Sequence, residues 1–157
     1  MSEAQTIELL DHILHWAKIY SELKLPMIAV YGLTSEGNCQ CIKGSDCNSA
    51  GKHPISKNWP KEATTDYEII KRQLAGGRNI GIVTGNGLDV IDLDGPTGII
   101  SFTTLAAEHD VPSCPIAESG SGGKHFFFKT AVSLPNRVKF MPGLDNRGEN
   151  GFVVVCP

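Results

Sequence analysis

The sequence predicts an α+β fold, and two observations carry this prediction. Of its 157 residues, 41% are hydrophobic and 20% are charged, which is ordinary for a globular protein that buries its own core. From residue 79 onward, strand and helix patterns alternate, and further strand patterns follow them. We therefore expect a single sheet-containing domain over residues 1–157.

The first half of the chain predicts two helices and one buried strand. Apolar side chains recur at three- and four-residue spacing over residues 6–23, as they do along one face of a helix. A short apolar strand is expected over residues 27–31. Thr65 and Glu68 have the spacing of a capping box, which predicts a helix over residues 66–74.

The second half predicts several strands around one helix. Apolar strands are expected over residues 79–83 and 87–95, with a glycine-rich turn between them. A helix over residues 96–108 follows, because proline suits the first helical turn. Strands over residues 124–129 and 152–155 complete the pattern.

The strand over residues 87–95 carries two aspartates. Because side chains alternate across a strand, Asp92 and Asp94 are expected on one side, about 6 to 7 Å apart at their backbones. Both carboxylates could then bind one divalent cation or a pair of them. Asp145 and Arg147 have the same spacing and predict a third carboxylate beside a cation. The simpler alternatives are solvated surface acids and a weak surface ion pair.

A glycine-rich turn over residues 119–123 leads into a strand that begins with Lys124 and His125. Glycines let backbone N–H groups approach an anion such as phosphate. His125 is expected on the same face as Phe127 and Lys129. A packed, hydrogen-bonded histidine is the alternative, and the adjacent glycines favour a phosphate-binding role.

The polar segment over residues 32–58 is too long for an ordinary loop of a compact domain. It contains Cys39, Cys41, Cys47 and His53, a ligand set that tetrahedral zinc accepts. We therefore predict a structural zinc-binding loop, in which the ion takes the place of a core. Reduced thiols beside a chance histidine are the alternative.

Charge and hydropathy restrict the remaining possibilities. The net charge of −3 does not indicate nucleic-acid binding by bulk electrostatics, so any such contact must be local. No apolar run could span a membrane and the first residues do not form a signal peptide, so we expect a cytoplasmic protein with no membrane partner. Basic residues that indicate a local nucleic-acid path are Lys124, Lys129, Arg137, Lys139 and Arg147.

Three carboxylates with nearby lysine, histidine and arginine suit phosphoryl or nucleotidyl transfer. Four motifs then resemble a known family: residues 82–85, 90–94, 119–126 and 145–154. In this order they are similar to the primase-polymerase domain (bifunctional DNA primase/polymerase, N-terminal) of the archaeo-eukaryotic primase superfamily. Bacterial, phage and plasmid members also resemble this chain at residues 39–54 and at Trp59.

The resemblance implies a primase-type catalytic core, in which an antiparallel-rich sheet like that of an RNA-recognition motif packs against a second α/β unit. It implies two-metal catalysis of DNA-templated nucleotidyl transfer in replication, as primer synthesis, DNA polymerisation or both. The implied partners are single-stranded or primer-template DNA, nucleoside triphosphates, and a helicase domain or protein.

By the same resemblance, the catalytic Mg²⁺ or Mn²⁺ ions bind Asp92, Asp94 and Asp145. The residues implied for the incoming nucleotide, with His125 the principal phosphate contact, are Ser121, Gly122, Gly123, Lys124, His125 and Arg147. Many members have serine two residues before the motif histidine, where this chain has Gly123, so the hydroxyl contact either comes from Ser121 or is missing. Relatives also continue beyond the position of Pro157, so we expect a fragment of the full domain or a shorter form of it.

Two other functions remain open from the sequence. Asp92, Asp94 and Gly95 resemble the nucleophile motif of haloacid-dehalogenase-type phosphatases, but Pro96 follows the glycine and no later acidic pair appears. A non-catalytic, zinc-stabilised nucleic-acid-binding module is the second, and it leaves three converging carboxylates without a role.

Overall fold

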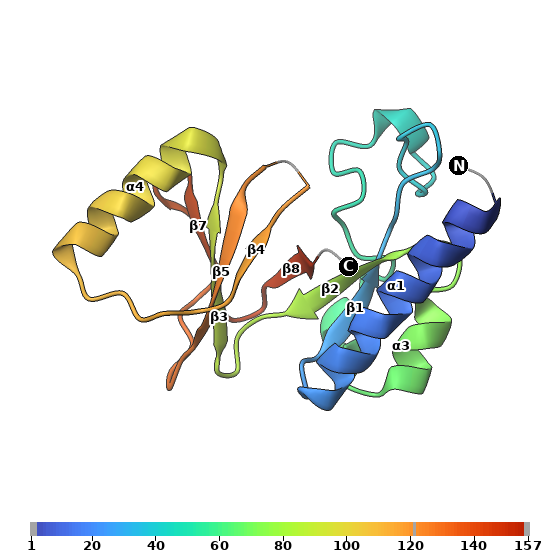
Figure 1. The fold of residues 1–157 in the computed structure, drawn as a ribbon, viewed down its shortest axis with the longest axis horizontal. Coiled ribbons are helices and arrows are strands. Elements are labelled where there is room, and N and C mark those ends of the chain that lie inside the picture. The colour runs from blue at the N-terminus through green and yellow to red at the C-terminus, as the bar shows by residue number, and fades with distance from the viewer. Residues whose placement is uncertain (1–2, 121, 156–157) are drawn as a thin grey trace. The chain divides into compact units, whose positions relative to one another are not determined.

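The computed structural model describes residues 3–120 and 122–155, which divide into two compact units. The N-terminal unit ends at Val83 and the C-terminal unit begins at Thr84. Figure 1 shows the elements of each unit along the chain. No helix among these residues is long and apolar enough to cross a membrane.

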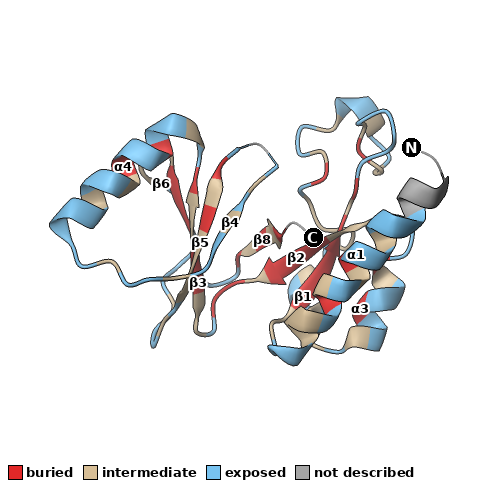
Figure 2. Ribbon diagram, viewed as in Figure 1, coloured by how far each residue is buried: buried red, intermediate tan, exposed pale blue. Residues whose placement is uncertain are grey.

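In the N-terminal unit, two helices pack against an antiparallel pair of strands. These elements are α1 (Glu3–Glu22), β1 (Met27–Val30), α3 (Tyr67–Gln73) and β2 (Asn79–Val83). All four β1 residues are buried, and α1 and α3 contribute buried side chains such as Ile13 and Ile70 to the same core. Figure 2 shows this buried layer in red along both strands. Burial of these apolar side chains is what holds the unit together.

Between β1 and α3, the chain forms a long loop with the short 3₁₀ turn η1 (Gly44–Asp46) and the short helix α2 (Trp59–Glu62). The loop returns to β1, because Tyr31 N donates to His53 O at 3.0 Å and Ile55 N donates to Ala29 O at 3.1 Å. These bonds fix the backbone of His53 beside the end of β1.

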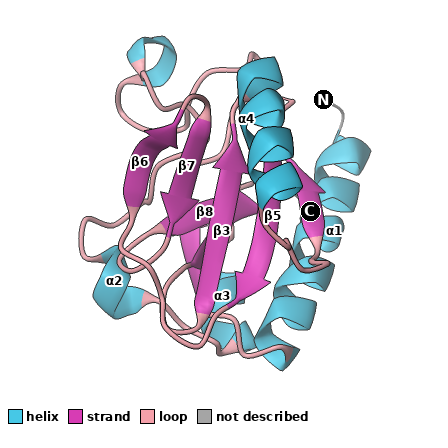
Figure 3. Ribbon diagram, turned by 90° about the vertical axis from the view of Figure 1, so that its left-hand side faces the viewer, coloured by secondary structure: helices cyan, strands magenta, loops and turns pink. Residues whose placement is uncertain are grey.

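The C-terminal unit is built on a five-stranded antiparallel sheet with the order β4-β5-β3-β7-β6. The helix α4 (Gly95–Glu108) packs against this sheet (Figure 3). The strands of the unit are β3 (Leu88–Leu93), β4 (Ile116–Glu118), β5 (Lys124–Lys129), β6 (Arg137–Met141), β7 (Leu144–Arg147) and β8 (Phe152–Val155).

The face of the sheet that α4 covers is apolar. Phe102 of α4 packs on Phe126 of β5 with 4.4 Å between ring centroids. Gly98 lets the helix approach closely, because a Cβ there would lie 2.4 Å from Gly143 O. Since neighbouring residues of a strand point to opposite faces, His125 lies on the face away from Phe126 and α4. It therefore shares a face with Phe127, as predicted.

Most of the predicted strands and helices are confirmed, with four corrections. The capping residue of α3 is Asp66, not Thr65, because the Asp66 carboxylate accepts from Glu68 N at 2.8 Å and from Ile69 N at 3.2 Å. The acidic strand ends at Leu93, one residue before Asp94. Gly95, with φ +59°, then turns the chain into α4. The sequence patterns also missed β6 and α2.

Candidate active site and metal-binding loop

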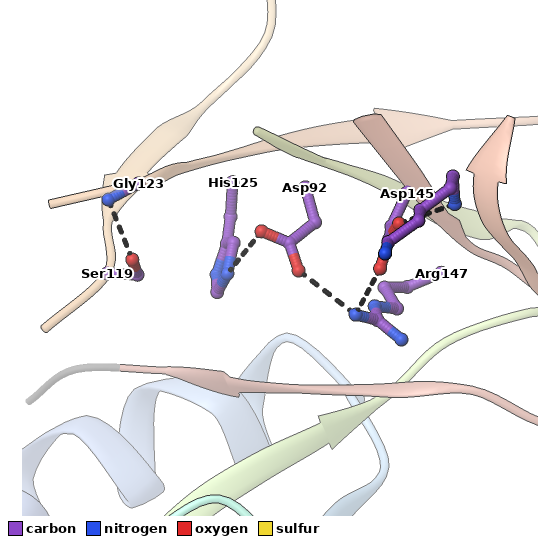
Figure 4. A network of polar contacts seen from close by, with 7 residues as sticks. Asp92, Ser119, Gly123, His125, Asp145 and Arg147 are labelled. Atoms are coloured by element: carbon purple, nitrogen blue, oxygen red, sulfur yellow. Dashed lines mark hydrogen bonds and ion pairs between the residues drawn. The ribbon is translucent and has the colours of Figure 1, made fainter. Parts of the chain in front are cut away.

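The candidate active site is centred on Asp92, in the middle strand of the C-terminal sheet. Asp92 lies opposite His125 of β5 on one side and opposite Asp145 of β7 on the other. Residues directly opposite one another in antiparallel strands share a face of the sheet. The register therefore brings three predicted site residues together from three strands (Figure 4).

Arg147 links the two carboxylates. Its Nη2 donates to Asp145 Oδ2 at 2.7 Å and to Asp92 Oδ2 at 3.3 Å. On the other side of Asp92, His125 Nε2 lies 3.3 Å from Asp92 Oδ1. Asp92 and Asp145 are direct cross-strand neighbours, and the shared Arg147 guanidinium offsets the repulsion between their carboxylates.

The second oxygen of Asp145 is bound by the backbone of β6. Lys139 N donates to Asp145 Oδ1 at 2.7 Å, and Lys139 has a φ of +52°. Sequence analysis singled out Lys139 only as a basic residue. A backbone contact that depends on a left-handed lysine has no signal in the sequence, because lysine rarely adopts that conformation.

Asp92 and Asp145 are both largely buried, and their neighbours decide the ionisation of Asp92. The side chains of Asp92 and Asp145 are 15% and 6% exposed, respectively. Burial by itself would raise the pKa of Asp92, but the hydrogen bond and charge of His125, followed by those of Arg147, outweigh it and lower that pKa. Asp92 is therefore held as a carboxylate.

Two further predicted residues are Asp94, which follows β3, and Lys124, which begins β5. Asp94 is exposed and directly precedes α4, where its backbone N donates to Gly143 O at 2.8 Å. Lys124 pairs with Leu93, on the face of the sheet that α4 covers, rather than on the face of Asp92. The register does not bring Lys124 into the Asp92 network.

The glycine turn joins β4 to β5. Ser119 closes it, because Ser119 Oγ accepts from Gly123 N at 3.0 Å and Ser119 O accepts from Gly122 N at 2.9 Å. Two N–H groups of the predicted phosphate nest are therefore engaged within the turn. Ser121 lies outside the described residues. Sequence analysis did not assign a role to the Ser119 hydroxyl, although a serine before a glycine run is a recognisable turn signal.

The predicted metal-binding loop brings its four side chains together. One ligand atom from each of Cys39, Cys41, Cys47 and His53 lies within 4.8 Å of all the others. His53 Nε2 lies 3.5 Å from Cys39 Sγ and 3.4 Å from Cys47 Sγ. A tetrahedral zinc ion would set sulfur and nitrogen ligands about 3.6 Å apart. The cluster is therefore compatible with zinc, in agreement with the sequence prediction.

The thiols of this cluster differ in their ionisation. Burial raises the pKa of Cys39, but backbone hydrogen bonds at Cys41 and Gly51 outweigh it and lower that pKa to about 6. The pKa of Cys47 is raised. A backbone hydrogen bond at Ser49 lowers it, but burial and the neighbouring thiols of Cys41 and Cys39 together outweigh that bond. A thiolate at Cys39 is the form that binds a metal ion.

The chain was compared with known proteins. None of the curated proteins matches it. The model of the family of bifunctional DNA primase/polymerase N-terminal domains matches residues 17–157, which is most of the chain and includes both the loop cluster and the Asp92 network. The resemblance found in the sequence motifs is confirmed: the chain belongs to the bifunctional DNA primase/polymerase family, and so to the nucleotidyltransferase-type enzymes.

Proposed function

We propose that this protein carries out DNA-templated nucleotidyl transfer, as a primase, a polymerase or both, in DNA replication. The observation that supports this best is the placement of Asp92 between His125 and Asp145 on one face of the sheet. The family match favours this function over the phosphatase alternative. The substrates would be nucleoside triphosphates and single-stranded or primer-template DNA.

In the proposed reaction, a 3′-hydroxyl oxygen forms a bond to the α-phosphorus of the incoming nucleotide. The bond from that phosphorus to its bridging oxygen breaks, pyrophosphate leaves, and the proton of the attacking hydroxyl passes to solvent. Negative charge develops on the phosphate oxygens, so cationic groups placed there lower the barrier. His125 and Arg147 are the nearest such groups to Asp92 and would hold the phosphates by hydrogen bonds.

Asp92, Asp145 and Asp94 would hold the divalent cations, Mg²⁺ or Mn²⁺. Carboxylate oxygens are the ligands these hard ions prefer. The contact of one Arg147 nitrogen with both Asp92 and Asp145 supports this assignment, because it marks a point where the two carboxylates attract a positive charge. When bound, the cations would supply Lewis acidity at the α-phosphate and neutralise the triphosphate.

The other predicted groups complete the proposal. Gly122, Gly123 and Ser121 would approach the triphosphate from the turn after β4, with Lys124 a weaker candidate. The Cys/His loop would bind a structural zinc ion, and the ion would hold the loop in shape.

We also propose that the two units form a primase-type core acting in the cytoplasm.

The test is a primer-synthesis assay on single-stranded DNA, with ribonucleotides and deoxyribonucleotides supplied separately. We expect incorporation that depends on Mg²⁺ or Mn²⁺ and is lost in the double variant Asp92→Asn/Asp145→Asn. The matched control is Asp110→Asn, which removes an exposed carboxylate of the same unit. Full incorporation by the double variant would exclude the proposed site.

A further inference from the structure

A pocket of about 160 Å³ lies within the N-terminal unit, among elements that the proposed reaction does not use. Its apolar side is formed by Ile28 and Ala29 of β1 and by Ile55, which the backbone bond to Ala29 holds beside that strand. Trp59, the first residue of α2, adds a half-buried indole. A rigid strand and a large aromatic ring thus border the same space.

Polar groups border the pocket as well. Arg78 is half-buried and its Nη1 donates to Gln73 O at 2.9 Å, so the guanidinium is held at the end of α3. Gln73 and Ser56 also line the pocket and can both donate and accept hydrogen bonds. Glu62, at the end of α2, contributes a carboxylate. An apolar pocket with a few polar groups is typical of a small-molecule or base-binding site.

The size and chemistry of the pocket restrict what fits. A cavity of about 150 Å³ accepts a single benzene ring, so this pocket suits one flat ring system rather than a whole nucleotide. An aromatic base fits this size and this lining, because it stacks on an indole and offers donors and acceptors at its edge.

We propose that this pocket binds one unpaired base of a DNA strand, stacked on Trp59, with Gln73 and Arg78 at the base edge. The site is separate from the Asp92 network and lies wholly in the other unit. The choice of DNA as the source of the base rests on the proposed function. The role of the site would be to hold single-stranded DNA by a base, with little dependence on sequence, because every base has a face that can stack.

Fluorescence tests this directly, because the protein has only two tryptophans, Trp16 and Trp59. In a Trp16→Phe background, Trp59 is the only indole. We expect single-stranded oligodeoxyadenylate of about ten nucleotides to quench it, and an abasic strand of the same length and charge to leave it unchanged. Trp59→Ala in the otherwise native chain should weaken binding of the same oligonucleotide about 5- to 100-fold. Trp59→Phe keeps a flat aromatic ring and should retain most of the oligonucleotide affinity.

The outcomes separate the pocket from the proposed function. Equal quenching by the abasic strand would show phosphate binding and overturn the inference, as would quenching by a proline-rich peptide but not by the oligonucleotide. Unchanged oligonucleotide affinity in Trp59→Ala would also overturn it, with thermal melting used to confirm that the variant is folded. If Trp59 is quenched by bases while the wild-type protein incorporates no nucleotide, the pocket stands and the proposed function fails. If the protein incorporates nucleotides but Trp59 is not quenched by bases, the proposed function stands and the pocket proposal fails.

Discussion

The metal-binding loop and the Asp92 network both hold ionisable groups close together, but by different means. The loop takes its four ligands from residues 39–53, one short stretch of chain that limits how far apart they can lie. The network takes Asp92, His125 and Asp145 from three strands that only the sheet brings side by side. The first depends on local spacing and the second on long-range pairing.

The two sites also differ in how their charge is balanced. Within the described chain, Arg147 already bridges the two carboxylates of the network. The loop has three thiols and one imidazole, and a bound zinc ion would compensate the negative charge of the thiolates. We therefore expect loss of the ion to damage the loop structurally, while loss of one network carboxylate should damage chemistry more than folding.

The largest effect is expected on activity. Asp92→Asn keeps the shape of the side chain but removes the charge that would bind a cation, so nucleotide incorporation should fall about 100- to 1000-fold, in the range found for key electrostatic groups. Circular dichroism and zinc content should remain those of the native protein. Incorporation within a few-fold of the native rate would contradict the role given to Asp92.

The second effect is on the loop. Cys39→Ser should reduce the zinc content from about one ion per chain to much less than one. It should also lower the free energy of unfolding by about 3 to 4 kcal/mol, because a tightly bound ion that binds only the folded state stabilises it by about that amount. Metal analysis and chemical denaturation measure the two quantities. Cys114→Ser is the matched control, because Cys114 lies outside the cluster. A native protein that contains no zinc would contradict the prediction.

A smaller effect is expected from Arg147→Ala. Asp92 and Asp145 would then lose their shared donor while remaining largely buried, at a cost of about 1 to 3 kcal/mol in the free energy of unfolding. Arg147→Lys keeps the positive charge and should recover part of that loss. Denaturant titration of the three proteins distinguishes these outcomes, and equal stability of Arg147→Ala and the native protein would argue against the bridge.

The smallest effect concerns pH. Because the pKa of Asp92 is lowered from its ordinary 3.8 in the folded protein, its contribution to stability is complete above that value. It is lost as the pH falls through the folded-state pKa. In metal-free protein, carbon NMR of the Asp92 carboxyl should show this low pKa, and His125→Leu should raise it. Titration of native Asp92 at or above 3.8 would contradict the network.

Much of the fold was predictable because its patterns are local. The periodicity of apolar residues located α1, β2 and β5, and Pro96 indicated the start of α4. β6 was missed because its residues are mostly exposed and give no alternating apolar pattern. Asp66 replaced Thr65 as the cap because both residue types can cap a helix, and only the backbone geometry selects between them.

The sequence by itself identified the candidate site residues and the family. Cys39, Cys41, Cys47 and His53 could be grouped from their spacing, because a short loop restricts how far its ligands can separate. The motif order likewise led to the primase/polymerase family, which the family comparison confirmed.

Only the tertiary structure decided which of those residues meet. The antiparallel register places Asp92 directly between His125 and Asp145. A strand's pattern fixes its two faces but not its neighbours or their alignment. The same limit applies to the Trp59 pocket, whose walls come from β1, α2, α3 and the segments beside them, and exist only once these elements have packed.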